Sequence, residues 1–514
     1  MEKSNRIVLN TISQYLRTGI CMVLTLYSTR IILGVLGKSD YGIYTLIGGL
    51  VVMLGFITTS LSTSTQRFLS YSWGKNDLRE TKLIFSNAIF LHAGICVVLA
   101  LVLLLLEPFI VHGYLKIDSS RIAAADFVYY MVVLILCMTF LTAPVKALFI
   151  ARENIVFSSC VDVLDGCVKL GGAISLTWVT MDTLKAYAIL MASISVLTFL
   201  IYVTYGLTHY EECHVPRLKE FSWSYLRQFS GFAFWNVYAV GSGIIRTQGL
   251  AVILNRFLGT MVNAAYASLV NAAYGIALQV SGAANAIAAS IINSVNPQLM
   301  KAEGRGDRPE MLRLTTMESK YSYLILSTLL VPLIIEMPSV LTFWLGDYPT
   351  YSVQFCQMIL ASIIFDQTTI GLTSANQAIG KIRNYSLLIS TLRLLILPAA
   401  WLCLYWELPV YSVMMAYLGG EIICGLTRIP FLQYTAGLNV ADYCRLVYLK
   451  TLPAVAGNVL LSLLVSHSFS HPLRFILTEV LGIFVSLLLI YGFSLSADEK
   501  KWLRSRISAK FLKR

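Results

Sequence analysis

The chain has 514 residues, of which 57% are hydrophobic and only 13% are Asp, Glu, Lys or Arg. That charged share is about half of the usual one, which is too small to cover the surface of soluble domains. Large soluble domains are therefore excluded. The net charge of +12 must then be explained by where the charges lie along the chain, not by nucleic-acid binding.

Fourteen apolar stretches are long enough to cross a membrane, at about 20 residues for each span. In chain order they are 10–33, 41–66, 83–106, 122–150, 155–178, 185–207, 231–258, 263–296, 321–345, 352–380, 385–406, 410–432, 448–469 and 474–495. We expect a tilt, an extramembrane turn or a break in the three longest, 122–150, 263–296 and 352–380. The sequence predicts an all-α, polytopic membrane protein with about fourteen transmembrane helices.

The basic residues separate by side of the membrane. The odd-numbered connections, counted from the amino terminus with their near flanks, hold 27 of the 39 Lys and Arg residues, and the even-numbered connections hold five. Cytoplasmic connections keep positive charge. Both termini are therefore predicted to be cytoplasmic, which requires an even number of spans.

Short matches along the chain indicate an internal repeat. Leu36-Gly37 with Tyr44 matches Leu258-Gly259 with Tyr266 at an offset of 222 in the numbering. GKNDLRE (74–80) matches GRGDRPE (304–310), and Asn154 matches Asn384, both at an offset of 230. Six spans lie between the members of each pair, so both copies have the same membrane orientation. The repeat predicts two pseudo-symmetric six-helix lobes around a cleft that opens to alternate sides of the membrane.

The spans and the repeat together predict a domain plan. It consists of an N-terminal lobe (1–208), a cytoplasmic linker (209–230), a C-terminal lobe (231–432), an appendage of two further spans (433–495) and a basic cytoplasmic tail (496–514).

Seven basic residues remain inside the predicted spans once the connections and their near flanks have been counted: Arg17, Arg30, Lys169, Arg246, Arg256, Arg393 and Arg428. A centrally placed charge in lipid costs roughly 2.5–3.5 kcal/mol, so most of these side chains are expected to face the protein interior. Those near span ends, Arg30, Arg256 and Arg428, have snorkelling as an alternative. We interpret Arg17, Arg30, Lys169, Arg246 and Arg393 as a cationic cavity, with structural ion pairs as the alternative.

Acidic residues within the spans are fewer. Asp162 and Asp165 have the spacing to pair with Lys169 on one helix face, and Glu421 has the spacing to pair with Arg428. Asp366 has no cationic neighbour in the sequence. It is therefore the candidate carboxylate for coupling to H+ or Na+.

Uncharged polar residues share helix faces in several spans. We interpret them as a polar cavity lining, with interhelical hydrogen bonding as the alternative; they are Gln14, Gln248, Asn255, Asn271, Asn285, Thr373 and Asn376. A hydrated cavity of positive potential suits an anionic, hydroxyl-rich cargo, because guanidinium groups pair with phosphate oxygens. This interpretation fails if carboxylates hold the basic side chains in a dry interior.

Two parts of the chain resemble a known family. FWNVYAVGSGIIRTQGLAVILNRFLGTMVNAAYASLVNAAYGI (234–276) with NPQLMK (296–301), and STRIILGVLGKSDYGIYTLI (28–47), resemble the Wzx-type polysaccharide-repeat flippases of the multidrug/oligosaccharidyl-lipid/polysaccharide exporter superfamily. The resemblance implies flipping of undecaprenyl-pyrophosphate-linked oligosaccharides to the periplasmic leaflet of the bacterial inner membrane, for O-antigen (lipopolysaccharide) or capsule synthesis. It further implies that Arg17, Arg30 and Arg246 engage the pyrophosphate.

This flippase hypothesis sets the expected partners. They are the lipid-linked oligosaccharide, the bilayer, and a polysaccharide polymerase or glycosyltransferases; no nucleic acid is expected, and the protein is expected to be a monomer. No cofactor is expected beyond a coupling H+ or Na+. No metal site is expected either, because the ten cysteines lack a CxxC motif and histidines at ligand spacing.

Two alternatives remain. The first is a cation- or proton-coupled multidrug or metabolite antiporter of the same superfamily, against which the seven basic residues within the spans argue. The second is a membrane glycosyltransferase or polymerase. Such an enzyme is disfavoured because the longest external connection, 107–121, is about 15 residues long and no catalytic motif occurs. We expect a transporter and not an enzyme.

Overall fold

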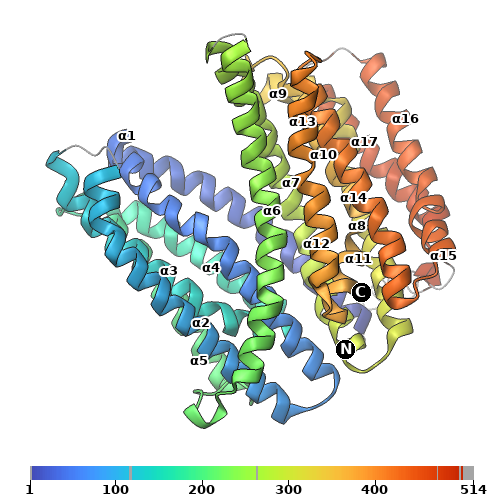
Figure 1. The fold of residues 1–514 in the computed structure, drawn as a ribbon. Helices are drawn as coiled ribbons and strands as arrows, with labels where there is room; N and C mark the ends of the chain where they lie inside the picture. Colours follow the sequence, from blue (N-terminus) through green and yellow to red (C-terminus); the bar gives the residue numbers. More distant parts are fainter. Residues whose placement is uncertain are drawn as a thin grey trace, which may run out of the picture. The chain divides into compact units, whose positions relative to one another are not determined.

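The computed structural model describes residues 3–114, 119–261, 264–469, 471, 473–496 and 499–501. Its secondary structure in these ranges is helical, with no strand. The predicted all-α fold class is therefore confirmed. Figure 1 shows the helices in chain order.

The first half of the chain forms six long helices that coincide with the predicted spans. They are α1 (Lys3–Gly74), α2 (Leu78–Glu107), α3 (Ile122–Ala151), α4 (Ile155–Ser175), α5 (Thr183–His209) and α6 (Trp223–Met261). Short turns η1 (Pro108–Tyr114), η2 (Ser119–Arg121), η3 (Leu176–Trp178) and η4 (Leu218–Glu220) join or extend them. Gly37, at φ 74° and ψ 168°, breaks α1 into two helices between the predicted spans 10–33 and 41–66.

The second half contains more and shorter helices. They are α7 (Ala264–Gly304), α8 (Arg308–Ile335), α9 (Met337–Leu345), α10 (Ser352–Gln367), α11 (Ile370–Ile379), α12 (Ile382–Leu394), α13 (Ile396–Tyr405), α14 (Ser412–Ala436), α15 (Val440–Cys444), η5 (Arg445–Leu449), α16 (Leu452–Ser468), α17 (Arg474–Leu489) and η6 (Ile490–Ser494). Of the three longest predicted spans, 352–380 breaks between α10 and α11, whereas α3 and α7 run on through Pro144 and Pro297.

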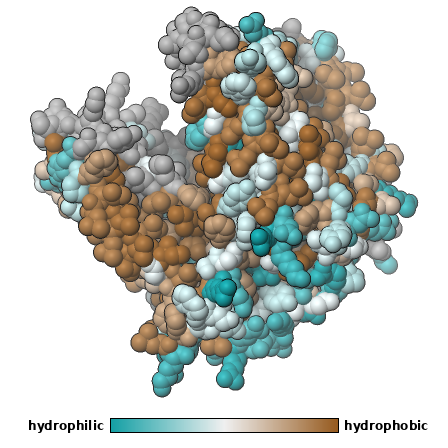
Figure 2. Space-filling view, viewed as in Figure 1, coloured by the Kyte–Doolittle hydropathy of each residue, from teal (hydrophilic) through white to brown (hydrophobic). Residues whose placement is uncertain are grey.

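The surface is that of a multi-pass membrane protein. Among the described residues, ten helices are long and apolar enough to cross a membrane, and eleven if α10 and α11 form one span bent by 48°. The ten do not include α4 and α14, which carry ionic residues that lower hydropathy. Large hydrophobic side chains such as Leu105 and Val480 are exposed, and Figure 2 shows broad hydrophobic stretches on the face in view.

The chain divides into two compact units. Unit 1 comprises residues 1–240 and 293–307, and unit 2 comprises residues 241–292 and 308–514. In unit 1, α3 packs against α1, α2 and α5, and α1 also packs against α4. In unit 2, α8 packs against α10, α11, α16 and α17. The predicted lobe, linker and tail boundaries remain predictions.

Polar contacts hold the two helices of the predicted appendage to α8 and to the residue between α8 and α9. The Asn458 side chain on α16 donates to the carbonyls of Ser327 and Thr328 at 3.3 and 3.2 Å. On α17, Arg474 donates to Glu336 at 2.9 Å. Inter-helix hydrogen bonds of this kind stabilise packing where lipid supplies no hydrophobic driving force.

An ionic network ties the α2–α3 connection to two other helices of unit 1. The Arg121 guanidinium donates to Asp40, which follows the α1 break, at 2.9 Å and to Asp182 at 2.6 Å. Asp182 also caps α5 by accepting from the amides of Leu184 and Lys185. Partial burial alone would raise the pKa of Asp182, but the bonds from Arg121 and the α5 amides lower it.

Two loops of the predicted repeat have the same backbone. α1 ends at Gly74 and α7 ends at Gly304, and in both cases the next helix begins four residues later. Asn76 (φ 60°) and Gly306 (φ 76°) share the offset of 230 and occupy the left-handed region in the middle of these loops. The structure therefore supports the alignment of GKNDLRE with GRGDRPE.

The third predicted match is wrong. Asn154 precedes α4, whereas Asn384 is the third residue of α12. The equivalent positions are Glu153 (φ 63°) and Gly380 (φ 86°), each just after a helix end and at an offset of 227. The second copy is thus three residues shorter before this loop, which a fixed offset of 230 does not allow for.

Candidate functional site

Five ionic side chains gather inside unit 2, and we call them the unit 2 cluster: Arg246 on α6, Asp366 on α10, Arg393 on α12, and Glu421 and Arg428 on α14. Asp366 Oδ1 lies 2.7 Å from Arg428 Nη2 and 3.4 Å from Arg393 Nη2. Glu421 pairs with Arg393 at 3.3 Å and with Arg246. Each carboxylate is thus held by two guanidinium groups from different helices.

The break between α10 and α11 positions Asp366. Asp366 lies in the last turn of α10, and the two helices meet at Thr368 and Thr369 with a bend of 48°. Arg428 donates to the Thr369 hydroxyl at 3.2 Å, and Tyr443 donates to the Thr368 carbonyl at 2.6 Å. A broken helix inside a membrane protein needs such partners for its backbone, and breaks of this kind often mark ion and substrate sites.

The partners in this cluster differ from those that sequence spacing predicts. Glu421 does not pair with Arg428 but with Arg246 and Arg393. Asp366 does have cationic partners, and they come from other helices. The snorkelling alternative for Arg428 is wrong, because its side chain is only 2% exposed.

A second cluster, the unit 1 cluster, consists of Arg17 on α1, Lys146 on α3, and Asp162, Asp165 and Lys169 on α4. Asp162 accepts from Arg17 at 2.5 Å and from Lys146 at 2.9 Å. Lys169 pairs with Asp165 at 2.6 Å, as the i, i+4 spacing predicts. The predicted pairing of Asp162 with Lys169 is replaced by the contacts with α1 and α3.

The structure describes the contacts or the burial of most residues of the predicted cavity. Arg17, Lys169, Arg246 and Arg393 each contact a carboxylate, which is the structural alternative to a cationic cavity. Thr373 bonds the Tyr385 hydroxyl at 2.6 Å, and Asn376 donates to a carbonyl of its own helix. Gln14 is buried, whereas Gln248 and Asn285 are exposed. The side chains of Arg30, Asn255, Asn271 and Arg256 lie outside the described residues.

Two ionic residues of the interior escape the sequence analysis. Lys146 lies within the predicted span 122–150, but its charge is counted there with the cytoplasmic connection that follows; it lies on α3, which runs to Ala151. Glu318 is placed before the span 321–345, but α8 begins at Arg308, and the Glu318 side chain is buried with Ser374 as its hydrogen-bond donor at 2.9 Å. The GRGDRPE loop marks the start of α8, so it would have placed Glu318 inside the helix.

Two glycines of the repeat allow a close crossing within unit 1. A β-carbon on Gly74 would lie 2.3 Å from the carbonyl oxygen of Lys301, and one on Gly304 would lie 2.1 Å from that of Tyr71. Because Tyr71 and Lys301 are themselves equivalent at the repeat offset of 230, the contact is reciprocal. Both positions require the absence of a side chain.

Glu153 fixes the end of α7 beside this crossing. Its carboxylate accepts from Lys301 at 2.6 Å and from Gln298 at 3.1 Å. The side chains of Lys301 and Glu153 are 11% and 8% exposed. The end of α7 is thus tied to the loop between α3 and α4.

Comparisons with known proteins identify the fold. Residues 15–151 match the MatE family. The structure resembles that of MATE in the bent conformation with a TM-score of 0.72 and 11% identity, over 87% of this chain and 97% of that one. It also resembles the MATE transporter ClbM in complex with Rb+, with a TM-score of 0.67 and 17% identity, over 83% and 94%.

A third similar structure is a MOP superfamily transporter from Pyrococcus furiosus, with a TM-score of 0.70 and 11% identity, over 86% of this chain and 97% of that one. The reverse polarity of that transporter's binding pocket suggests a different function for it. A comparison with curated protein sequences gives no match. At these identities the likeness shows the fold: the chain has a MATE-like fold of two helical lobes. The narrower Wzx-type resemblance is not confirmed.

Proposed function

We propose that the chain is a cation- or proton-coupled antiporter that exports drug-like or metabolite molecules across a membrane. The fold supports the transporter class. One similar structure is titled a multidrug resistance MATE family transporter of the MOP superfamily in an outward-facing conformation, with 12% identity and a TM-score of 0.69. Another holds Rb+.

The observation that carries the proposal is the pairing of the interior basic residues with carboxylates. The basic residues within the spans disfavour an antiporter only as long as they have no acidic partners. Arg17, Lys169, Arg246, Arg393 and Arg428 all have carboxylate partners. The interior therefore carries the acidic groups that organic cations and coupling ions need, so the basic residues do not count against an antiporter.

Asp366 is the proposed coupling residue. A proton or Na+ that binds this carboxylate competes with Arg428 and Arg393 for the same oxygens, and so does a cationic solute. Two ligands that compete for one group cannot occupy it together, so binding of one releases the other. Exchange at a single carboxylate, joined to alternating access, gives antiport.

Transport of a cationic dye by the purified chain tests the proposal. In proteoliposomes, ethidium is expected to cross the membrane faster than in protein-free vesicles when a Na+ or pH gradient is imposed. This difference in rate is expected to disappear when both gradients are collapsed. Asp366→Asn, which keeps an oxygen acceptor for Arg428, is expected to reduce this rate by about tenfold or more per folded molecule. Asp347→Asn, at an exposed carboxylate between α9 and α10, is the matched control.

One result would overturn the antiporter hypothesis: ethidium transport at the rate of protein-free vesicles under every gradient, with the protein folded in the vesicles. Equal dye transport by Asp366→Asn and Asp347→Asn would remove Asp366 from coupling but leave the antiporter standing.

A lipid-linked oligosaccharide flippase is the second candidate. Each cluster has one more cationic group than carboxylates, with three Arg to two acids in unit 2 and three basic groups to two acids in unit 1. The excess charge would suit a pyrophosphate. Polymerases or glycosyltransferases would then be partners. The test is the movement of a labelled lipid-pyrophosphate oligosaccharide from one leaflet to the other in the same vesicles. Movement that is lost in Arg17→Ala and Arg246→Ala would favour this candidate.

A further inference from the structure

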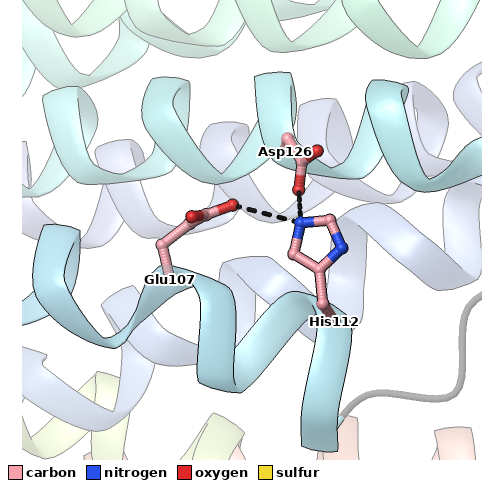
Figure 3. A group of neighbouring side chains, drawn as sticks. All are labelled: Glu107, His112 and Asp126. Atoms are coloured by element: carbon pink, nitrogen blue, oxygen red, sulfur yellow. Dashed lines mark ion pairs between the residues drawn. The ribbon is translucent and has the colours of Figure 1, made fainter.

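Three metal-ligating side chains converge at one end of unit 1 (Figure 3). Glu107 ends α2, His112 lies in the π-helical turn η1, and Asp126 lies near the start of α3. His112 Nε2 is 3.2 Å from Asp126 Oδ1 and 3.8 Å from Glu107 Oε1. One ligand atom of each residue lies within 4.8 Å of those of the other two.

The two carboxylates of this cluster face each other and the His112 imidazole. The Glu107 side chain is nine-tenths buried, with 10% exposed, in the part of the chain that the structure describes. Asp126 Oδ1 is buried and has no hydrogen-bond partner there. Two carboxyl groups brought this close together, one of them buried, are held by a shared proton or by a cation between them. The neighbouring imidazole supplies the third ligand that a metal ion at this place needs.

The donor set selects the kind of cation. One imidazole nitrogen with two carboxylate oxygens suits a divalent transition-metal ion, whereas Mg2+ and Ca2+ favour oxygen donors alone. Zn2+ binds such ligands at about 2.0–2.2 Å, which puts the ligand atoms of a tetrahedral site about 3.3 Å apart. The separations of 3.2 and 3.8 Å therefore need only small side-chain rotations.

The site is also open to an arriving ion. The His112 side chain is 48% exposed, so one side of the cluster faces outward while Glu107 closes the other. An entry path is one condition for a metal site, and on the exposed side a water molecule can complete the tetrahedral coordination of the ion. By the distribution of basic residues, the connection 107–121 is predicted to be extracytoplasmic, so the ion would come from that side.

We propose that Glu107, His112 and Asp126 bind a divalent transition-metal ion such as Zn2+, which fastens the connection after α2 to α3. The expectation from the sequence that the protein has no metal site considered cysteines and histidines and not this set. The three residues are separate in sequence by five and fourteen positions, and the fold brings them together.

Zn2+ titration of the purified, metal-stripped full-length chain in detergent tests the site. Calorimetry is expected to show one Zn2+ per chain with a dissociation constant of about 10 μM or tighter, and Zn2+ is expected to raise the melting temperature. His112→Ala and Glu107→Gln are each expected to weaken binding by about tenfold or more. His467→Ala, at an exposed histidine on α16, is expected to bind Zn2+ as the wild type does.

Two results would overturn the proposal. One is Zn2+ binding by His112→Ala with the wild-type affinity and stoichiometry, which would place the ion elsewhere. The other is the absence of Zn2+ binding by the wild type, which would show that the three side chains contact one another without a metal ion. His112 is half exposed, so its replacement is expected to fold even where Glu107→Gln does not.

Discussion

An Asp366→Ala protein is expected to lose about 3–5 kcal/mol in the free energy of unfolding, because the change leaves buried cations without their counter-charge. Arg428 is 2% exposed and has Asp366 as its carboxylate partner at 2.7 Å. Arg393 also contacts Asp366 but keeps Glu421 at 3.3 Å. The loss therefore falls mainly on Arg428, whose charge would stay in an apolar interior.

The melting temperature and the monodisperse yield in detergent measure this effect. Asp347→Ala, at an exposed position, is the matched control and is expected to change stability by less than about 0.5 kcal/mol. The double variant Asp366→Leu with Arg428→Met is expected to recover most of the stability, since well-packed apolar side chains often replace a buried ion pair without cost. If Asp366→Ala and Asp347→Ala had the same melting temperature, the cluster would not be a closed ion-pair network.

Stability recovered without transport would separate the two roles of the cluster. The double variant has neither a carboxylate for a coupling ion nor the guanidinium that competes with it. A folded double variant that still exports ethidium under a Na+ or pH gradient would show that ion coupling lies elsewhere. Glu318, buried with Ser374 as its hydrogen-bond donor, would then be the next carboxylate to test.

The fold was predictable because a membrane span can be recognised from the composition of a single continuous stretch of sequence. Each predicted span coincides with a helix, part of a helix or a pair of helices, and the helix break at Gly37 lies in the predicted connection between the first two spans. The break within 352–380 is one of the three irregularities expected for that span. The site was predictable only in its residue types. The partners of Asp366 lie 27 and 62 residues away on α12 and α14, and the partners of Asp162 lie on α1 and α3. Spacing along one helix cannot show contacts that packing between helices creates.

The repeat shows the same limit in another form. A constant offset of 230 found the loops at Gly74 and Gly304, where helix ends and backbone angles agree. It failed at Asn154 and Asn384, because the second copy is shorter by three residues before that loop. Motif matches locate equivalent segments where the loop geometry itself depends on the residues, as it does for a left-handed turn.

Gly304→Ala is expected to slow transport by about tenfold or more while the protein remains folded. An added β-carbon would lie 2.1 Å from the Tyr71 carbonyl oxygen, so the ends of α1 and α7 must move apart. Overpacking of this kind costs about 1–3 kcal/mol, which is enough to shift a two-state equilibrium about 5- to 150-fold. If the crossing is one closed end of the transport cycle, the variant disfavours that state and turnover falls. Ethidium transport per folded molecule is the measurement.

Gly94→Ala is the control, because a β-carbon on Gly94 has no atom within 4 Å. Gly74→Ala is expected to match Gly304→Ala, since its β-carbon would meet the Lys301 carbonyl at 2.3 Å across the same crossing. The double variant should then cost less than the sum of the two, because helices that have moved apart for one methyl group accommodate the other. Additive losses would mean two independent local clashes. Transport by Gly304→Ala at the Gly94→Ala rate would show that the transport cycle does not need this close crossing.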